Sequence, residues 1–215
     1  MARALQLAVK RAADVVGAAL LLALLSPLLA VIAVAVRLTS PGEALFRQAR
    51  AGRGGRTFTI LKFRTMVRDA PSSPLGSYCY ADDPRITRLG RILRATSLDE
   101  LPQLVNVLRG DMSFVGPRPD LPHHVARYTL AQRRRLELRP GITGWAQVNG
   151  RNDIPWERRI ELDLQYIARW SLWLDAVVVV RTVRVLLTGK GVRLPKKVGD
   201  TSWQTEGKAS GSPRS

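Results

Sequence analysis

The chain has 215 residues, enough for one domain with a hydrophobic core but short for two full domains. It carries 34 Lys and Arg against 17 Asp and Glu, a net charge of +17, so we expect anionic partners: nucleic acid, an acidic membrane surface or substrates that bear phosphate. A single cysteine excludes an internal disulfide, and one cysteine with two histidines argues against a structural zinc site.

The first element is an apolar segment from Val15 to Val36 that contains no charged residue. About 20 apolar residues are enough to cross the hydrocarbon core of a bilayer, so the segment is long enough to enter a membrane. A cleavable signal peptide fits poorly, because its apolar region is shorter and a small-residue cleavage site should follow it. A helix buried in a soluble core is the other alternative, and the basic residues on both flanks argue against it.

These basic flanks also conflict with a simple membrane span, because Lys and Arg favour the cytoplasmic side of the membrane. Pro27 lies in the middle of the segment, where proline removes a backbone donor and kinks a helix. The Ser26 hydroxyl is placed to satisfy a carbonyl that the kink frees. Each arm would contain about ten residues and reach roughly 15 Å, half a bilayer. We therefore predict a re-entrant membrane helix within residues 1–39, in preference to a span.

After a turn at Ser40-Pro41-Gly42, the chain predicts one compact domain over residues 40–195 and a disordered tail over residues 196–215. A turn at residues 53–56 and alternating β-branched and aromatic residues predict a short strand at Thr57–Phe63. Helices are predicted over Thr87–Thr96, Ser97–Arg109, Arg127–Leu138 and Pro155–Leu187, the last broken near Ser171. The segments Ala70–Gly76 and Pro140–Arg151 are rich in Pro, Gly and Ser and predict loops, the second alternatively an irregular strand. The fold class predicted is α+β and predominantly helical.

The last predicted helix carries aromatic and basic residues close together, among them Trp156, Trp170 and Trp173. Such residues suit the headgroup region of a membrane, where rings and cationic groups are both satisfied. An ordinary amphipathic helix packed on the core has the same pattern. Both interpretations stay open, so interfacial amphipathic helices are one expectation for this segment.

The polar residues most suggestive of chemistry lie in Ala95–Pro119, which contains the acidic pair Asp99 and Glu100. Ser97 followed three residues later by Glu100 matches a capping box, so the pair can be explained as the start of a helix. The same position suits a nucleophilic aspartate, because backbone N–H groups at the start of a helix favour a bound phosphate.

The basic residues that flank this pair along the chain are Arg85, Arg88, Arg91, Arg94 and Arg109. Arg118 follows between two prolines, which restrict the backbone and would orient its guanidinium for a bidentate phosphate contact. A run of charge alone usually marks a solvated face. An acidic pair among arginines, beside a rigid Pro-Arg-Pro segment, favours instead a site that handles phosphate.

The sequence resembles the bacterial sugar transferase family, the monotopic phosphoglycosyl transferases that begin lipid-linked glycan assembly, such as exopolysaccharide synthesis, at the cytoplasmic face of the bacterial inner membrane. The resemblance covers nearly the whole chain except the tail. It rests on the apolar segment with Ser26-Pro27, KFRTM at Lys62–Met66, TSLDELPQL at Thr96–Leu104, GDMSFVGPRP at Gly110–Pro119, RPGITGWAQVNGR at Arg139–Arg151 and SLWLD at Ser171–Asp175.

The resemblance implies that residues 40–195 are a catalytic domain that transfers a sugar-1-phosphate from a UDP-sugar to polyprenyl (undecaprenyl) phosphate in two steps. Asp99 would attack the sugar-bearing phosphate and expel UMP, and polyprenyl phosphate would then attack the covalent aspartyl-phosphosugar. Mg²⁺ is the implied cofactor; it would bridge phosphate oxygens and contact Asp99.

By the same resemblance, Arg94 and Arg118 would hold phosphate or brace the site, and Glu100 would act as a general base or orient the acceptor. Further candidates for contacts with nucleotide or phosphate are Lys62, Arg64, Gln147 and Arg151. Inner-membrane lipids are the other expected partners, while the transferred sugar, the pathway and the oligomeric state stay open. A membrane-anchored basic nucleic-acid-binding protein is the alternative from another class. We find no nucleic-acid module in the sequence, so we expect no nucleic-acid partner.

Overall fold

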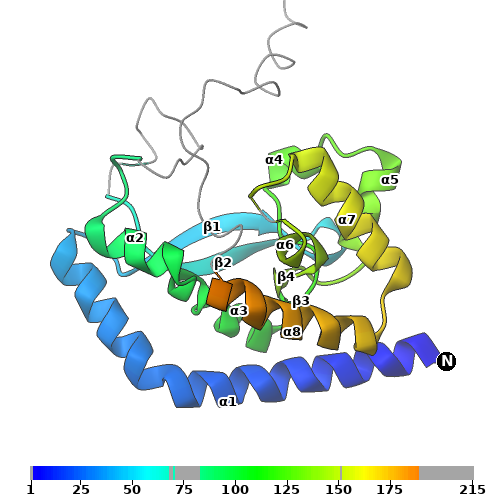
Figure 1. The fold of residues 1–215 in the computed structure, drawn as a ribbon, viewed down its shortest axis with the longest axis horizontal. Helices are drawn as coiled ribbons and strands as arrows, with labels where there is room; N and C mark the ends of the chain where they lie inside the picture. The colour runs from blue at the N-terminus through cyan, green and yellow to red at the C-terminus, as the bar shows by residue number, and fades with distance from the viewer. Residues whose placement is uncertain (1, 68–69, 71–82, 151, 189–215) are drawn as a thin grey trace, which may run out of the picture.

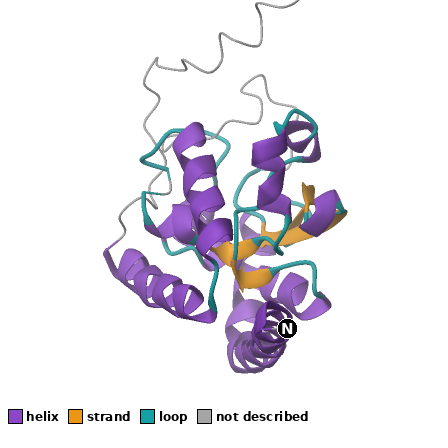
Figure 2. Cartoon of the chain, turned by 90° about the vertical axis from the view of Figure 1, so that its right-hand side faces the viewer, coloured by secondary structure: helices purple, strands orange, loops and turns teal. Residues whose placement is uncertain are grey.

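The computed structural model describes residues 2–67, 70, 83–150 and 152–188. In them, helices surround two small two-stranded sheets, which confirms the expected α+β class with helix predominant. Figure 1 shows the other elements on the concave side of the long first helix, and Figure 2 shows the strands in the interior with helices on either side. The tail predicted over residues 196–215 lies outside the described residues, as does most of the loop predicted at Ala70–Gly76.

The first helix, α1 (Ala2–Thr39), is 38 residues long and continues through Pro27. Pro27 has no N–H to donate to the carbonyl of Ala23, four residues earlier, and the Ser26 hydroxyl donates to that carbonyl at 2.9 Å. The predicted role of Ser26 is thereby confirmed. The helix is bent (Figure 1), and proline is a common cause of such a bend. By length and composition α1 is apolar enough to cross a membrane.

One side of α1 packs on the domain and the other is apolar and exposed. Only 11% of its most apolar stretch of 18 residues is buried, which excludes a helix enclosed in a soluble core. Ala18, Ile32 and Val36 are buried against the domain. The apolar side chains most exposed along the helix are Leu5, Val16, Leu20, Leu24, Val31, Val34 and Leu38. Such a continuous apolar face is typical of a surface that contacts lipid.

A buried polar network ties the start of α1 to the last two helices, α7 (Trp156–Arg169) and α8 (Leu172–Thr188). The Asp175 carboxylate accepts hydrogen bonds from Lys10 Nζ at 2.5 Å, Tyr166 Oη at 2.6 Å and Trp170 Nε1 at 3.3 Å. The predicted break near Ser171 is confirmed, because α7 and α8 are separate helices. Helix α7 buries an apolar face against the core, whereas α8 exposes Trp173, Val180 and Leu187.

Strands β1 (Leu45–Ala51) and β2 (Thr57–Phe63) form an antiparallel hairpin in which Leu45 pairs with Phe63. The second strand has the predicted bounds. The connecting turn, η1 (Arg53–Gly55), is the predicted one, and Gly54 and Gly55 adopt positive φ values of 67° and 79° there. The first strand was not predicted, because its three polar residues follow no strict alternation.

The second sheet pairs β3 (Ser113–Val115) in parallel with β4 (Gly141–Thr143). The two chains approach so closely that a Cβ at Gly141 would lie 2.1 Å from the backbone nitrogen of Gly116, so glycine is required. The segment predicted at Pro140–Arg151 as a loop or irregular strand thus contains β4, followed by the short helix α6 (Trp145–Val148). The pairing places the Pro-Arg-Pro segment beside residues far along the chain.

The remaining helices agree with the sequence in part. Helix α2 (Arg88–Ala95) confirms a prediction, and the Thr87 hydroxyl caps it by accepting a hydrogen bond from Gly90 N. The prediction of one continuous helix over Ser97–Arg109 is wrong, because a 3₁₀ turn, η3 (Leu98–Glu100), precedes α3 (Gln103–Arg109). The end of α3 before Gly110 is as predicted. The continuous helix predicted at Arg127–Leu138 is also wrong. The chain there forms α5 (Leu130–Arg133) and η4 (Arg134–Leu136), after a short α4 (Pro122–Val125).

Candidate active site

The acidic pair lies in η3, between the end of α2 and the start of α3. Ser97 precedes the turn with a φ of 58°, the one non-glycine residue with positive φ among those the structure describes. It makes no side-chain capping hydrogen bond, so the capping box predicted for Ser97 and Glu100 is wrong. A conformation this rare persists only where the surroundings enforce it, and such residues concentrate at functional sites. The turn therefore presents the acidic pair in a constrained geometry.

The two carboxylates of the pair differ in their contacts. Both residues are buried, with 9% of Asp99 and 6% of Glu100 exposed. Glu100 Oε1 accepts hydrogen bonds from Lys62 Nζ at 2.7 Å and from Arg118 Nη2 at 3.0 Å. Within the described part of the chain, the Asp99 side chain makes no hydrogen bond and no ion pair. Glu100 is thus committed to two cations, while the Asp99 carboxylate is available to react.

The electrostatics of the site follow from this arrangement. Burial, and then the adjacent Glu100, raise the pKa of Asp99 above its ordinary value, although Lys62, Arg94 and Arg118 oppose the rise. Burial also lowers the pKa of Lys62, against the opposing attraction of Glu100. Perturbed carboxyl and amine groups at one buried position are typical of reactive sites. The cations would also compensate the charge of an incoming phosphate.

Arg118 is held by a backbone that is fixed on both sides. Every carbonyl from Pro117 to Asp120 accepts a hydrogen bond from another segment. Gly141 N donates to Pro117 O at 3.0 Å, and Arg135 Nη2 donates to Arg118 O at 3.2 Å. Arg50 Nη1 donates to Pro119 O at 3.3 Å, and Ala51 N donates to Asp120 O at 2.9 Å. Because the main chain is fixed and two prolines flank Arg118, little backbone freedom remains to be lost when its guanidinium binds a ligand.

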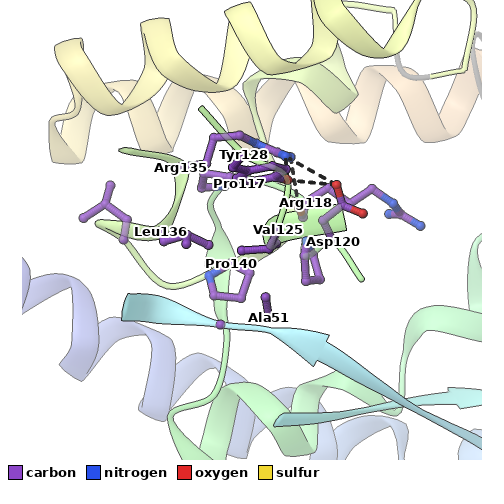
Figure 3. A pocket seen from close by; sticks show the side chains of 12 residues that line it. Ala51, Pro117, Arg118, Asp120, Val125, Tyr128, Arg135, Leu136 and Pro140 are labelled. Atoms are coloured by element: carbon purple, nitrogen blue, oxygen red, sulfur yellow. Dashed lines mark hydrogen bonds and ion pairs between the residues drawn. The ribbon is translucent and has the colours of Figure 1, made fainter. Parts of the chain in front are cut away.

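A cluster around Asp120 braces the same segment (Figure 3). The Asp120 carboxylate accepts a hydrogen bond from Tyr128 Oη at 2.8 Å and lies 2.8 Å from His124 Nδ1. Burial tends to raise the pKa of Asp120, but hydrogen bonds from His124 and Tyr128 outweigh it, and the pKa lies below its ordinary value. Arg135 bonds Tyr128 and, at 2.7 Å, Asp163. The loop after β3 is therefore tied to α7.

A cavity of about 200 Å³ lies beside Arg118 and the Asp120 cluster, between β1, α6 and α7. Its cationic lining residues are Arg50, Arg118, Arg135 and Arg159. Gln147 from α6 and Asp163 from α7 also line it. Neither amide atom of Gln147, nor Asp163 Oδ1, has a hydrogen-bond partner among the described residues, although all three atoms are buried. Burial raises the pKa of Asp163 to about 6, against the attraction of Arg135. Unsatisfied buried polar groups beside a cationic cavity indicate a ligand site.

The other predicted site residues differ in whether they act on the acidic pair. Arg94 Nε donates to Thr65 Oγ1 at 2.7 Å, and its charge acts on Asp99. Arg64 is engaged elsewhere: its guanidinium donates to the carbonyls of Ser40 at 2.6 Å and Pro41 at 2.8 Å, at the end of α1. The structure therefore does not bring Arg64 to the acidic pair. Arg151 lies outside the described residues.

Sequence reasoning missed Arg50, Arg159 and Asp163 as residues of this cavity. Asp163 could have been found, because it interrupts the apolar face that α7 forms with Ile160 and Ile167, and a buried acid on such a face needs a reason. Arg159 lies four residues before it on the same helix. Arg50 had no signal, because the strand that carries it was not predicted.

The sequence is similar to known sugar transferases. The family model described as bacterial sugar transferase matches residues 5–189. The chain is 45% identical over 186 residues to the uncharacterized sugar transferase EpsL of Bacillus subtilis, covering 86% of this chain and 90% of that protein. It is 51% identical over 187 residues to the UDP-glucose:undecaprenyl-phosphate glucose-1-phosphate transferase of Caulobacter vibrioides, covering 83% and 70%. It is 41% identical over 191 residues to the UDP-N-acetylgalactosamine-undecaprenyl-phosphate N-acetylgalactosaminephosphotransferase of Aeromonas hydrophila, covering 86% of this chain and 45% of that protein.

Proposed function

Because the chain belongs to the bacterial sugar transferase family, we propose that it transfers a sugar-1-phosphate from a UDP-sugar to undecaprenyl phosphate, as the first membrane step of glycan assembly. One observation carries the proposal: Asp99 is buried without a bonded partner in the described residues, next to Glu100, which holds two cations. Relatives named for this kind of transfer use glucose or N-acetylgalactosamine, so the family leaves the sugar open.

In the first step, an Asp99 carboxylate oxygen attacks the phosphorus that bears the sugar. A bond forms between Asp99 and phosphorus, and the bond from that phosphorus to the UMP oxygen breaks, so UMP leaves with the bonding electrons. Lys62 and Arg118 lie at the neighbouring Glu100 and offset the negative charge that gathers at the phosphate. UMP needs no proton to leave, because its phosphate carries the charge.

In the second step, a phosphate oxygen of undecaprenyl phosphate attacks the same phosphorus. The bond to Asp99 breaks, the carboxylate is restored, and the product is a diphosphate that joins the lipid to the sugar. Glu100 acts in both steps as a positioning residue, because its carboxylate oxygen already binds Lys62 and Arg118 and two bound cations weaken a base. This arrangement favours orientation over general base catalysis for Glu100.

We propose that magnesium enters this site bound to the phosphates of the substrate. Among the described residues, no three His, Cys, Asp or Glu side chains gather to hold a metal. Mg²⁺ commonly binds one or two carboxylates and completes its shell with phosphate oxygens and water. Asp99 is the carboxylate free to contribute, and the bound ion would neutralise charge on the diphosphate.

The cavity beside Arg118 supports a binding site for the nucleotide part of the donor, with Gln147 at its wall. Replacing Gln147 by leucine is expected to weaken UMP binding roughly tenfold, the effect of one or two lost hydrogen bonds. The same change should raise the free energy of unfolding by about 1 kcal/mol, because a buried unsatisfied amide is removed. Titration calorimetry with UMP and thermal unfolding measure the two effects.

A matched control for this variant is Gln165→Leu on the exposed face of α7, which should leave UMP binding unchanged. Wild-type UMP affinity in Gln147→Leu would remove Gln147 from the nucleotide site. Loss of UMP binding in both variants would instead indicate a general effect of the added leucine.

We further propose that α1 is re-entrant, so that both of its ends lie at the cytoplasmic face of the inner membrane. The bend in α1 and the domain on its concave side support this arrangement (Figure 1). Single cysteines at Leu5 and Glu43, in a background with Cys79→Ser, should react with an impermeant maleimide from the same side of sealed vesicles. Reaction of the two sites from opposite sides would establish a span.

The reaction itself is tested by UMP release from a panel of UDP-sugars, with undecaprenyl phosphate and magnesium present. The proposal expects rapid UMP release with at least one donor and a lipid product that carries its sugar. Release of UDP in place of UMP would identify a different transfer.

A further inference from the structure

Three arginines converge at the end of α3 that is remote from the acidic pair, and we refer to Arg11, Arg53 and Arg139 as the arginine cluster. Each guanidinium is anchored to a backbone carbonyl. Arg11 donates to Val107 O at 2.6 Å and to Leu108 O at 3.0 Å. Arg139 Nε donates to Gly110 O at 2.8 Å, and Arg53 Nε donates to Glu137 O at 3.1 Å. None of the three makes an ion pair with a residue that the structure describes.

The positive charge of the cluster is only partly compensated. Burial lowers the pKa of Arg139, and Arg11 and Arg53 lower it further, with Asp14 opposing them. Asp14 Oδ1 already accepts hydrogen bonds from Ser113 Oγ and Phe114 N, both at 3.1 Å. The other nearby carboxylate, on Asp111, accepts one from Asn106. Like charges held this close repel one another, and a bound anion would relieve the repulsion.

A cavity of about 510 Å³ opens beside the cluster, larger than the cavity next to Arg118. Three arginines, Arg53, Arg56 and Arg139, and one acidic residue, Asp111, line it, together with backbone of the β1–β2 turn and of Gly110. A smaller pocket continues from Arg53 and Arg139 to Arg11 and Leu7 on α1. The cluster thus has room for a polar group, and it borders the helix that faces lipid.

The position of the cluster relative to the exposed apolar face of α1 also suits contact with lipid headgroups. Arg11 points to the domain side of α1, and at about 100° per residue Val9 and Val16 lie on the opposite side, where both are exposed. A helix is about 10 Å across with its side chains. When the apolar face of such a helix enters the acyl region by about 5–10 Å, its polar face stands among the headgroups.

We propose that the arginine cluster binds the phosphate of an anionic phospholipid headgroup. Guanidinium groups recognise phosphate oxygens through paired N–H donors, and each arginine here retains donors beyond its carbonyl contact. Free phosphate shares this chemistry, but the position on the domain side of α1, at the level of the headgroups when the opposite face enters the membrane, favours the lipid. The site is separate from the reacting phosphates, because the seven residues of α3, about 10 Å of helix, lie between Gly110 and the turn that carries Asp99.

The test uses the full chain, purified in detergent, and follows its thermal unfolding while dispersed phosphatidylglycerol is added. The expected result is stabilisation that saturates with phosphatidylglycerol and is absent with phosphatidylcholine. In Arg53→Gln/Arg139→Gln, affinity for phosphatidylglycerol should fall roughly 30-fold, from about fivefold for each basic residue near a lipid surface. Arg11 is left unchanged because it holds the end of α3.

The matched control is Arg127→Gln/Arg133→Gln, which removes the same charge from exposed positions near α4 and α5, on the far side of the domain from α1 (Figure 1). It should keep wild-type affinity for the lipid. Equal affinity in the control and the cluster variant would overturn the proposal, and so would equal stabilisation by inorganic phosphate. If the double variant fails to fold, Arg53→Gln alone gives the same test, because Arg53 is exposed and makes one carbonyl contact.

Discussion

Replacing Asp99 by asparagine is expected to reduce UMP release from the UDP-sugar by at least about 1,000-fold, because an amide cannot form the acyl phosphate. Glu100 cannot substitute for it, since its carboxylate binds Lys62 and Arg118. UMP release is measured with and without undecaprenyl phosphate, so that loss of the first step is seen directly. A variant that releases UMP at the wild-type rate would exclude Asp99 as the nucleophile.

Stability provides an internal control for the same variant. The pKa of Asp99 is raised in the folded protein, so ionising it is harder in the fold than in the unfolded chain. A carboxyl of this kind lowers the free energy of unfolding as pH rises above its unfolded pKa. Asp99→Asn should therefore be at least as stable as wild type at pH 7, and this advantage should shrink as pH falls toward the ordinary carboxyl range. Lower stability at pH 7 would indicate a structural role instead.

Replacing Glu100 by glutamine is expected to lower kcat/KM about 100-fold, because the amide no longer fixes the charges of Lys62 and Arg118. Part of the loss should appear in KM, since both cations are proposed to offset the charge of the incoming diphosphate. Glu161→Gln on the exposed surface of α7 is the matched control and should retain activity. Wild-type kinetics in Glu100→Gln would contradict the positioning role.

The pH profile of this variant separates a positioning residue from a general base. The proposed mechanism requires ionised Asp99, so activity should be lost as pH falls through the pKa of Asp99. Glu100 raises that pKa, so Glu100→Gln should move the acid limb of kcat/KM to lower pH. A general base at position 100 would give a different outcome: two carboxylates would have to be ionised in the wild type, so Glu100→Gln would make the acid limb less steep instead of moving it at unchanged slope.

The sequence predicted well those helices and strands whose ends are marked by residues close by in the chain. The alternation at Thr57–Phe63, the helix predicted from Thr87 and the helix end predicted at Arg109 each give a boundary that the structure reproduces. The hydroxyl of Ser26 follows the same logic, because the carbonyl freed by a proline lies at a fixed spacing. Such features depend on nearby residues alone.

Elements decided by tertiary contacts were predicted poorly. The strand β1 has no clean alternation and exists because β2 pairs with it. The turn at Asp99 is 3₁₀ and begins with a left-handed serine, although a capping box in the sequence favoured a continuous helix. In both cases the fold overrides the local preference.

The site shows the same division. Asp99, Glu100, Lys62 and Arg118 were predicted together through the resemblance to the family, and the structure places them at one point. Spacing alone could not have joined Lys62 to Glu100, because strand β2 and turn η3 meet only in the folded domain. The arginines around the cavity come from separate elements, and single-sequence patterns carry no signal for that convergence.

The covalent intermediate is the most direct measurement. The protein is incubated with a UDP-sugar and magnesium without undecaprenyl phosphate, quenched and digested, and its peptides are analysed by mass spectrometry. A two-step reaction at Asp99 predicts that the peptide containing Asp99 gains the mass of one phosphosugar, and that later addition of undecaprenyl phosphate removes it. UMP release without an adduct on this peptide, or an adduct on another residue, would contradict nucleophilic catalysis by Asp99.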